Sequence, residues 1–203
     1  MWRRCGRTRS LHEETDYGVF RKSSMNKELR SIIDDDIKRG YDRRLFRKPL
    51  QLRYLVTWRK ASFYGKKHPL GIFYRIRLNR LSEKSGIQIP TDTKIGKGLF
   101  IVHFGTIIVN PAVSIGSNVN IAPNVVIGKA NRGDKKGTPK IGDRVWIGAG
   151  SVIVGNINIG EDVLVAPNSY VNCDVPSHSI VIGNPGVIHH KDEATLDYIN
   201  NMV

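Results

Sequence analysis

Residues 141–160 read IGDRVWIGAGSVIVGNINIG, and an isoleucine returns every six residues, at Ile141, Ile147, Ile153 and Ile159. A step of six does not match an α-helix, whose apolar stripe recurs every three or four residues. It suits a short strand followed by a turn. Because one such unit buries too little to fold alone, successive units must wind round and stack on each other. This stretch predicts a coil of stacked strands.

The same period extends over most of the second half of the chain. Within each block the step is six, and Gly or Asn near the corners suits tight turns. At three units per triangular turn, the pattern predicts a little over four turns, about 20 Å tall at the spacing of paired strands. The thirteen aliphatic positions are Ile89, Ile95, Ile101, Val109, Ile115, Ile121, Ile127, Ile141, Ile147, Ile153, Ile159, Val165 and Val171.

Two interruptions break the period. One is the extra pair Ile107 and Ile108, just after His103. The other is the glycine-rich, cationic stretch 129–140, KANRGDKKGTPK, which cannot form two regular units. Interruptions in such coils often hold functional residues, although this stretch could also be a mobile surface loop.

The chain before the coil has a different pattern. Residues 25–42, 50–65 and 70–86 carry apolar residues at roughly helical spacing, which predicts two or three helices. The expected organisation is therefore a disordered or non-native extension over 1–24, a basic helical region over 25–86, a β-helix over 87–188 and a tail over 189–203.

Composition narrows the class of protein. The 203 residues are 40% hydrophobic and 25% charged, which is typical of one folded domain with a modest appendage. No apolar run is long enough to cross a bilayer and no secretory signal is recognisable, so we expect a cytoplasmic protein. Two distant cysteines, Cys5 and Cys173, favour neither a disulfide framework nor a cysteine metal site.

The net charge of +14 is concentrated in one segment. Residues 38–80 hold fourteen Lys or Arg and one Asp, whereas residues 81–203 are neutral. Three interpretations remain open for this basic segment: nucleic-acid binding, which no motif accompanies; a solvated helical face; or contact with anionic lipid headgroups. In the last, Trp58, Phe63, Tyr64, Phe73 and Tyr74 would lie at the membrane interface.

Residues 95–110, IGKGLFIVHFGTIIVN, together with the 129–140 loop, residues 141–160 and the closing IVIGNPG of 180–186, resemble the hexapeptide-repeat acyltransferases. The resemblance is to serine acetyltransferases and their relatives in surface-polysaccharide biosynthesis. It implies a mainly β fold, a left-handed parallel β-helix, against the usual right-handed crossover rule. It also implies a homotrimer that binds acetyl-CoA between neighbouring subunits.

By this resemblance His103 is the catalytic base. A neutral imidazole, with a reference pKa of about 6.5, can take the proton of a hydroxyl as the oxygen attacks a thioester. Gln88 stands where the family has an aspartate that holds the imidazole, so it can orient the ring but cannot supply charge. No metal is needed, and a zinc enzyme of this fold would need several histidines where the regular repeats offer only His103.

The resemblance also assigns the substrate-binding residues. The 129–140 loop would close over the acceptor, with Asn131, Arg132 and Thr138 as its contacts. Acetyl-CoA would lie along the coil edges, with amides near Ala149, Gly150, Ala166 and Pro167 bonding to it and Lys191 meeting its 3′-phosphate.

Three departures from the family pattern bear on the acceptor. Besides Gln88, Val102 replaces a second acid, and Gly137–Thr138 replaces an Arg–His pair that grips the amino acid. A sugar hydroxyl, on a small molecule or a lipid-linked saccharide at the inner membrane face, is therefore the favoured acceptor. The alternatives are a serine O-acetyltransferase of cysteine biosynthesis and, from another class, an inactive hexapeptide-repeat binding scaffold.

Overall fold

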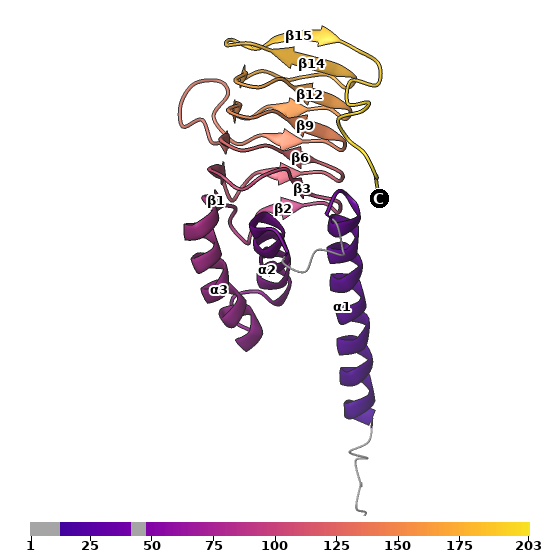
Figure 1. The fold of residues 1–203 in the computed structure, drawn as a ribbon. Coiled ribbons are helices and arrows are strands. Elements are labelled where there is room, and N and C mark those ends of the chain that lie inside the picture. The colour runs from indigo at the N-terminus through magenta and orange to yellow at the C-terminus, as the bar shows by residue number, and fades with distance from the viewer. Residues whose placement is uncertain (1–12, 42–47) are drawn as a thin grey trace, which may run out of the picture.

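The computed structural model describes residues 13–41 and 48–203, with side chains described from residue 26 onward. Three helices, α1 (Glu13–Lys38), α2 (Leu50–Tyr64) and α3 (Pro69–Ser85), lie against one end of a coil of short strands (Figure 1). The predicted helices are confirmed. Helix α1 begins well before Met25, inside the stretch expected to be a disordered extension, while residues 1–12 lie outside the described residues.

The strands stack into three sheets that form the faces of a triangular prism. In the order of hydrogen bonding, sheet A consists of β1 (Ile87–Gln88), β4 (Ile107–Val109), β7 (Val125–Gly128), β10 (Val152–Val154) and β13 (Tyr170–Val171). Sheet B consists of β2 (Lys94–Ile95), β5 (Ser114–Ile115), β8 (Lys140–Ile141) and β11 (Asn158–Ile159). Sheet C consists of β3 (Phe100–Ile101), β6 (Asn120–Ile121), β9 (Val145–Ile147), β12 (Val163–Val165), β14 (Ser179–Ile182) and β15 (Val187–His190).

The predicted β-helix of six-residue steps is confirmed. All paired strands are parallel except β15, which turns back antiparallel on β14. The coil makes about five turns rather than little more than four, because it continues beyond Val171 through Val175 and β14. Aliphatic side chains on the predicted period fill the interior, and Ile127, Ile147 and Ile153 are each 0% exposed.

The outward side chains give each face its own chemistry, because alternate residues of a strand point to opposite sides. Sheet A presents a mostly apolar column: Gln88, Ile108, Val126, Val152 and Tyr170. Sheet B presents a polar and cationic column: Lys94, Ser114, Lys140 and Asn158. Sheet C presents a column of large side chains interrupted by one amide: Phe100, Asn120, Trp146, Leu164 and Ile180.

The helices close the open end of the coil. An exposed strand edge leaves backbone groups unpaired, and here side chains from the helices bond to them. Tyr54 donates its hydroxyl hydrogen to the Ile89 carbonyl and accepts from the Ile89 amide at 2.9 Å. Burial raises the pKa of Tyr54 to about 12, so the hydroxyl keeps the proton that it donates. The guanidinium of Arg59 similarly donates to the carbonyls of Ile95 and Gly96.

The C-terminal tail, residues 191–203, runs back along sheet C toward the end of α1 (Figure 1). It bonds to the coil through Asn120, which donates to the Tyr198 carbonyl, and through Asn118, which bonds to both backbone groups of Val203. The Tyr198 ring packs edge-on against Trp146, with 5.0 Å between centroids. The tail therefore covers part of sheet C, whereas among the described residues it does not reach the column of sheet A.

Among residues 13–41 and 48–203, no helix combines the length and apolar character that a membrane crossing requires.

Candidate functional site

His103 lies on the turn that leads from β3 of sheet C to β4 of sheet A, and its side chain is exposed. This turn is held against the end of α3, since the Gly105 amide donates to the Ser85 carbonyl at 2.8 Å and the Ile107 amide to the Gly86 carbonyl at 3.2 Å. Gly105, with φ of 149°, leaves room for Pro123, whose Cβ would stand 3.0 Å from an added Cβ. The backbone therefore presents the imidazole to solvent at an edge of the prism.

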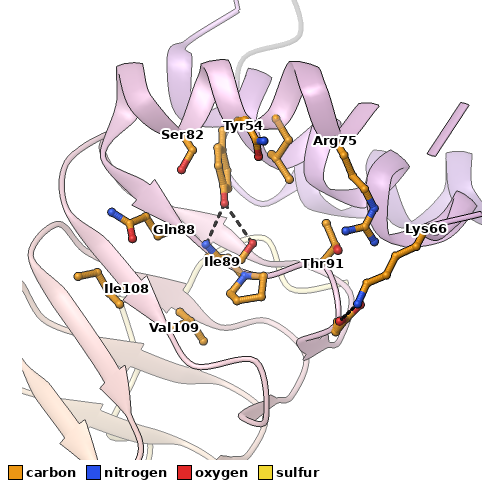
Figure 2. A pocket seen from close by; sticks show the side chains of 13 residues that line it. Tyr54, Lys66, Arg75, Ser82, Gln88, Ile89, Thr91, Ile108 and Val109 are labelled. Atoms are coloured by element: carbon orange, nitrogen blue, oxygen red, sulfur yellow. Dashed lines mark hydrogen bonds and ion pairs between the residues drawn. The ribbon is translucent and has the colours of Figure 1, made fainter. Parts of the chain in front are cut away.

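Gln88 lies on the strand next to the one that follows His103. Its partner in the parallel register is Ile108, and its side chain is exposed on the outer face of sheet A. Gln88 also lines a pocket of about 480 Å³ between α3 and the first coils (Figure 2). The structure thus brings the elements that carry the predicted base and its orienting group side by side.

The turns of this prism edge stack in register above His103. The coil passes from sheet C to sheet A at His103, then at Pro123, at Ala149–Gly150 and at Ala166–Pro167. Backbone bonds join successive levels: the Gly150 amide donates to the Pro123 carbonyl, and the Asn168 amide to the Ala149 carbonyl. At about 4.7 Å a level, the edge from His103 to Pro167 is about 14 Å long. The predicted base and four of the predicted CoA contacts therefore share one edge.

The backbone of this edge offers fewer free amides than expected. The Gly150 and Ala166 amides already donate to the carbonyls of Pro123 and Val181, and Pro167 has no N–H. What the corners do offer is a close approach. An added Cβ at Gly148 would stand 2.6 Å from the Pro167 nitrogen of the next level, so a glycine is needed for the coils to stack there.

Lys191 lines a pocket of about 670 Å³ between sheet C and the tail, next to the upper end of this edge. Ala166 and Pro167 line the same pocket, but so do Asp192, Glu193 and Asp197. Three carboxylates against one ammonium disfavour a phosphate group. The phosphate-binding role of Lys191 therefore stays a prediction, which the negative charges around Lys191 do not favour.

The 129–140 stretch forms a small hairpin that leaves the prism between β7 of sheet A and β8 of sheet B. Ala130 and Gly137 exchange two backbone bonds of 2.9 and 3.0 Å at its base. Asn131 and Arg132 are exposed near the tip, whereas the Thr138 hydroxyl donates to the Ala112 carbonyl at 3.1 Å. Two of the three predicted acceptor contacts are thus free to meet a ligand.

The hairpin and His103 lie at opposite edges of sheet A. Strands of this sheet begin at the His103 edge and end at the hairpin edge. Because strands of three or four residues span about 10 to 13 Å, the two edges are separated by about that distance. Within one copy of the chain, the predicted acceptor residues therefore do not meet the predicted base.

The pocket at Gln88 contains charged residues that the sequence analysis did not single out. Lys66 donates to Asp92 at 2.6 Å, and Arg75 lies near them (Figure 2). The hydrogen bond from Lys66, and to a smaller extent the charge of Arg75, hold the pKa of Asp92 below its usual range. A sequence signal for this pocket did exist, because Arg75, Asn79 and Ser82 follow helical spacing and form a polar stripe on α3.

Among the side chains described from residue 26 onward, no group of three or more His, Cys, Asp or Glu is arranged to hold a metal ion.

Comparison with known proteins agrees with this geometry. Residues 138–173 match the family model described as bacterial transferase hexapeptide (six repeats). The serine acetyltransferase of Staphylococcus aureus strain Mu50 is 42% identical over 108 residues, which are 53% of this chain and 51% of that protein. The chain thus spans about half the length of the curated relatives it matches.

Two solved structures extend the similarity over the helices. The serine acetyltransferase of Brucella abortus in complex with coenzyme A has a TM-score of 0.71 and 27% identity, covering 84% of this chain and 72% of that one. The Neisseria gonorrhoeae serine acetyltransferase in complex with serine has a TM-score of 0.67 and 25% identity, covering 85% and 74%. The resemblance to hexapeptide-repeat transferases of the serine acetyltransferase type is confirmed.

Proposed function

We propose that this chain is an acetyl-CoA-dependent O-acetyltransferase of the serine acetyltransferase type. The observation that carries the proposal is the shared edge of the prism. On this edge the exposed His103 lies below the corners formed by Ala149–Gly150 and Ala166–Pro167. An extended thioester lying along these corners would bring its acyl carbon to the imidazole. The Brucella relative, solved with coenzyme A, supports this choice of donor.

His103 acts as the general base. Its neutral imidazole takes the hydroxyl proton as the oxygen attacks the thioester carbonyl, and it returns that proton to the departing thiolate, so that one C–O bond forms and one C–S bond breaks. Gln88, one strand away, orients the acceptor or the ring by hydrogen bonding. Such base assistance contributes about 10² to 10⁴ in rate.

For the acceptor we propose serine in place of the sugar that the sequence analysis favoured. The matched relatives carry the name serine acetyltransferase, and one was solved with serine bound. A sugar hydroxyl is the second candidate. It is supported by the hairpin, where uncharged Thr138 stands at an expected acceptor position and its hydroxyl is already bonded to Ala112.

We further propose that the working unit is a homotrimer. The outward column of sheet A is mostly apolar and is not covered by the described tail, and a neighbouring copy seated on it would bury Ile108, Val126 and Val152. The same contact would bring the hairpin of one copy toward the His103 edge of the next. The separation of these two groups within one chain supports a site shared between copies.

The test of function is release of free CoA from acetyl-CoA, followed with a thiol reagent. Wild-type protein should release CoA in the presence of L-serine, and His103→Ala should lower kcat by at least about 100-fold. His189→Ala, at an exposed histidine on β15, is the matched control and should retain activity. An active His103→Ala variant would overturn the mechanism, and no release with serine or with sugars would favour the inactive scaffold.

Peripheral membrane contact is a separate proposal, supported by α3. Ile72, Phe73 and Ile76 are each half exposed or more, and Arg77 and Arg80 flank them. Trp58 takes no part, because it is 2% exposed and its indole nitrogen donates to the Pro90 carbonyl. Phe73→Ser with Ile76→Ser should abolish co-sedimentation with vesicles rich in anionic lipid; equal sedimentation of wild type and variant would contradict the contact.

A further inference from the structure

The pocket between α3 and the first coils contains a cation, Arg75, to which no described residue forms a hydrogen bond. Arg75 projects from α3, and its Nε atom is buried without a hydrogen-bond partner. Among the residues described from position 26 onward, Arg75 takes part in no hydrogen bond or ion pair. The buried Nε is an unfavourable feature in itself, whereas the rest of the half-buried guanidinium lines the pocket and can meet a ligand there.

The other charges of the pocket do not satisfy Arg75. Lys66 and Asp92 pair with each other at 2.6 Å, and their side chains are 65% and 56% exposed. Asp92 acts on Arg75 only as a nearby charge, without a direct bond. The three charged residues that line the pocket therefore sum to one positive charge.

The remaining lining supplies neutral hydrogen-bonding groups. Asn79 and Ser82 follow Arg75 along the same face of α3, and Gln88 faces them from β1. The Ser82 hydroxyl already donates to the Ile87 carbonyl, so toward a ligand it can only accept. Figure 2 shows Arg75 at one end of the pocket and Gln88, beside Ile108, at the other. A ligand held at Arg75 would extend toward the strand next to the His103 turn.

We propose that this pocket is the anion-binding subsite of the acceptor, with Arg75 as its specificity-determining residue. The acceptor is then a hydroxyl compound that carries a carboxylate or a phosphate, of which free serine is the smallest example. This inference rests on the proposed acetyl transfer for the role of the ligand, but not for its binding. A pocket of about 480 Å³ is in the range that holds ligands much larger than serine.

The chemistry of guanidinium explains the choice of ligand. Its planar donors match the oxygens of carboxylate and phosphate, and such charge-assisted bonds are stronger than neutral ones. The protein covers the Arg75 Nε, so a bound anion would bond to the terminal nitrogens of the guanidinium, which are not buried in this way.

Binding is tested with inorganic phosphate and with acetate, each titrated at constant ionic strength while the thermal unfolding midpoint is followed. Wild-type protein should be stabilised by at least one of them. Arg75→Gln, which keeps hydrogen-bonding ability but removes the charge, should weaken the apparent affinity tenfold or more. Arg77→Gln, which removes the same charge from an exposed position on α3, should change it less than twofold.

The two anions distinguish the source of the charge. Preference for phosphate indicates a phosphorylated acceptor, whereas equal or better binding of acetate indicates a carboxylate such as that of serine. The proposal is refuted if Arg75→Gln binds both anions as wild type does. It is also refuted if Arg77→Gln loses as much affinity as Arg75→Gln.

Kinetics separate this inference from the proposed function. Arg75→Gln should raise KM for the acceptor about tenfold while KM for acetyl-CoA stays unchanged, and Arg75→Lys should recover part of the loss. If anions bind through Arg75 but the protein transfers no acetyl group, the anion-binding subsite is supported and the proposed enzymatic function is refuted. If acetyl transfer depends on His103 but not on Arg75, the proposed function is supported and the subsite is refuted.

Discussion

The ion pair between Asp36 and Arg59 joins α1 to α2 at the end of the coil. The two side chains are 1% and 7% exposed and are linked by bonds of 2.8 and 3.0 Å. Asp36 also accepts from the Leu99 amide at 2.9 Å. Burial raises the pKa of Asp36 above its usual value, although Arg59 acts to lower it. The carboxylate therefore depends on Arg59 to remain charged inside the protein.

Removing one partner of this pair should be costly. Arg59→Met leaves Asp36 buried and unpaired, and we expect a loss of about 3 to 5 kcal/mol in the free energy of unfolding by urea. The double variant Asp36→Asn with Arg59→Met should lose less, because it removes the unpaired charge. Lys66→Met breaks the exposed pair with Asp92, which water screens, and should change the free energy of unfolding far less. Equal losses for the buried and exposed pairs would refute this account.

A buried carboxylate, Asp162, attaches the first part of the tail to the coil. Asp162 accepts from the amides of Ala194 and Thr195 at 3.1 Å, from the Thr195 hydroxyl at 2.6 Å and from His178 at 2.9 Å. Burial acts to raise the pKa of Asp162, but the bonds from Thr195 and His178 outweigh it and hold the pKa below the usual value. The tail is thus fastened most firmly when this carboxylate is ionised.

The lowered pKa of Asp162 determines how the contribution of this carboxylate to stability changes with pH. A group whose pKa is lower in the folded state contributes stability above its unfolded pKa, about 3.9, and loses it as the pH falls through the folded pKa. We expect Asp162→Asn to cost about 1 to 3 kcal/mol at pH 7, and the difference from wild type to shrink at pH 3. Urea unfolding measures this difference in stability, and hydrogen exchange of the 194–199 amides measures how firmly the tail is attached. Glu193→Gln, on the exposed side of the tail, should behave as wild type at both pH values.

The elements differ in how well local sequence predicts them. The coil was predictable because every sixth residue, such as Ile147 and Ile153, must be aliphatic to fill a narrow core. The course of the tail was not, because it depends on pairs such as Asn118 with Val203, which lie far apart in the chain and leave no period. His103 was found from its motif, whereas the environment of Arg75 exists only once α3 packs on the coil.

At the scale of the whole molecule, the three faces of the prism have three different environments. The described tail covers sheet C, and polar side chains such as Lys94 and Lys140 line sheet B. The apolar column of sheet A faces α3 only at its first levels, Gln88 and Ile108, and the described tail does not cover it. Because apolar columns of this kind are usually buried in an interface, the arrangement predicts how copies of the chain associate.

Val126→Lys tests that association. The side chain points outward from β7, so the substitution should leave the core intact while placing an unpaired charge in the interface between copies. Such a charge costs about 3 to 5 kcal/mol, which corresponds to a loss of association of 100-fold or more. Light scattering should show monomers at concentrations where wild type forms the proposed trimer. CoA release should fall with the trimer, because the hairpin and His103 of one copy lie at opposite edges of sheet A.

The matched control places the same charge on another face. Ser114→Lys points outward from β5 of sheet B, between Lys94 and Lys140, and should keep both the trimer and the activity. A monomeric Val126→Lys variant that releases CoA at the wild-type rate would mean that one chain holds a complete site. In that case the hairpin would have no part in the acceptor site, and the pocket beneath α3 alone would have to bind the acceptor.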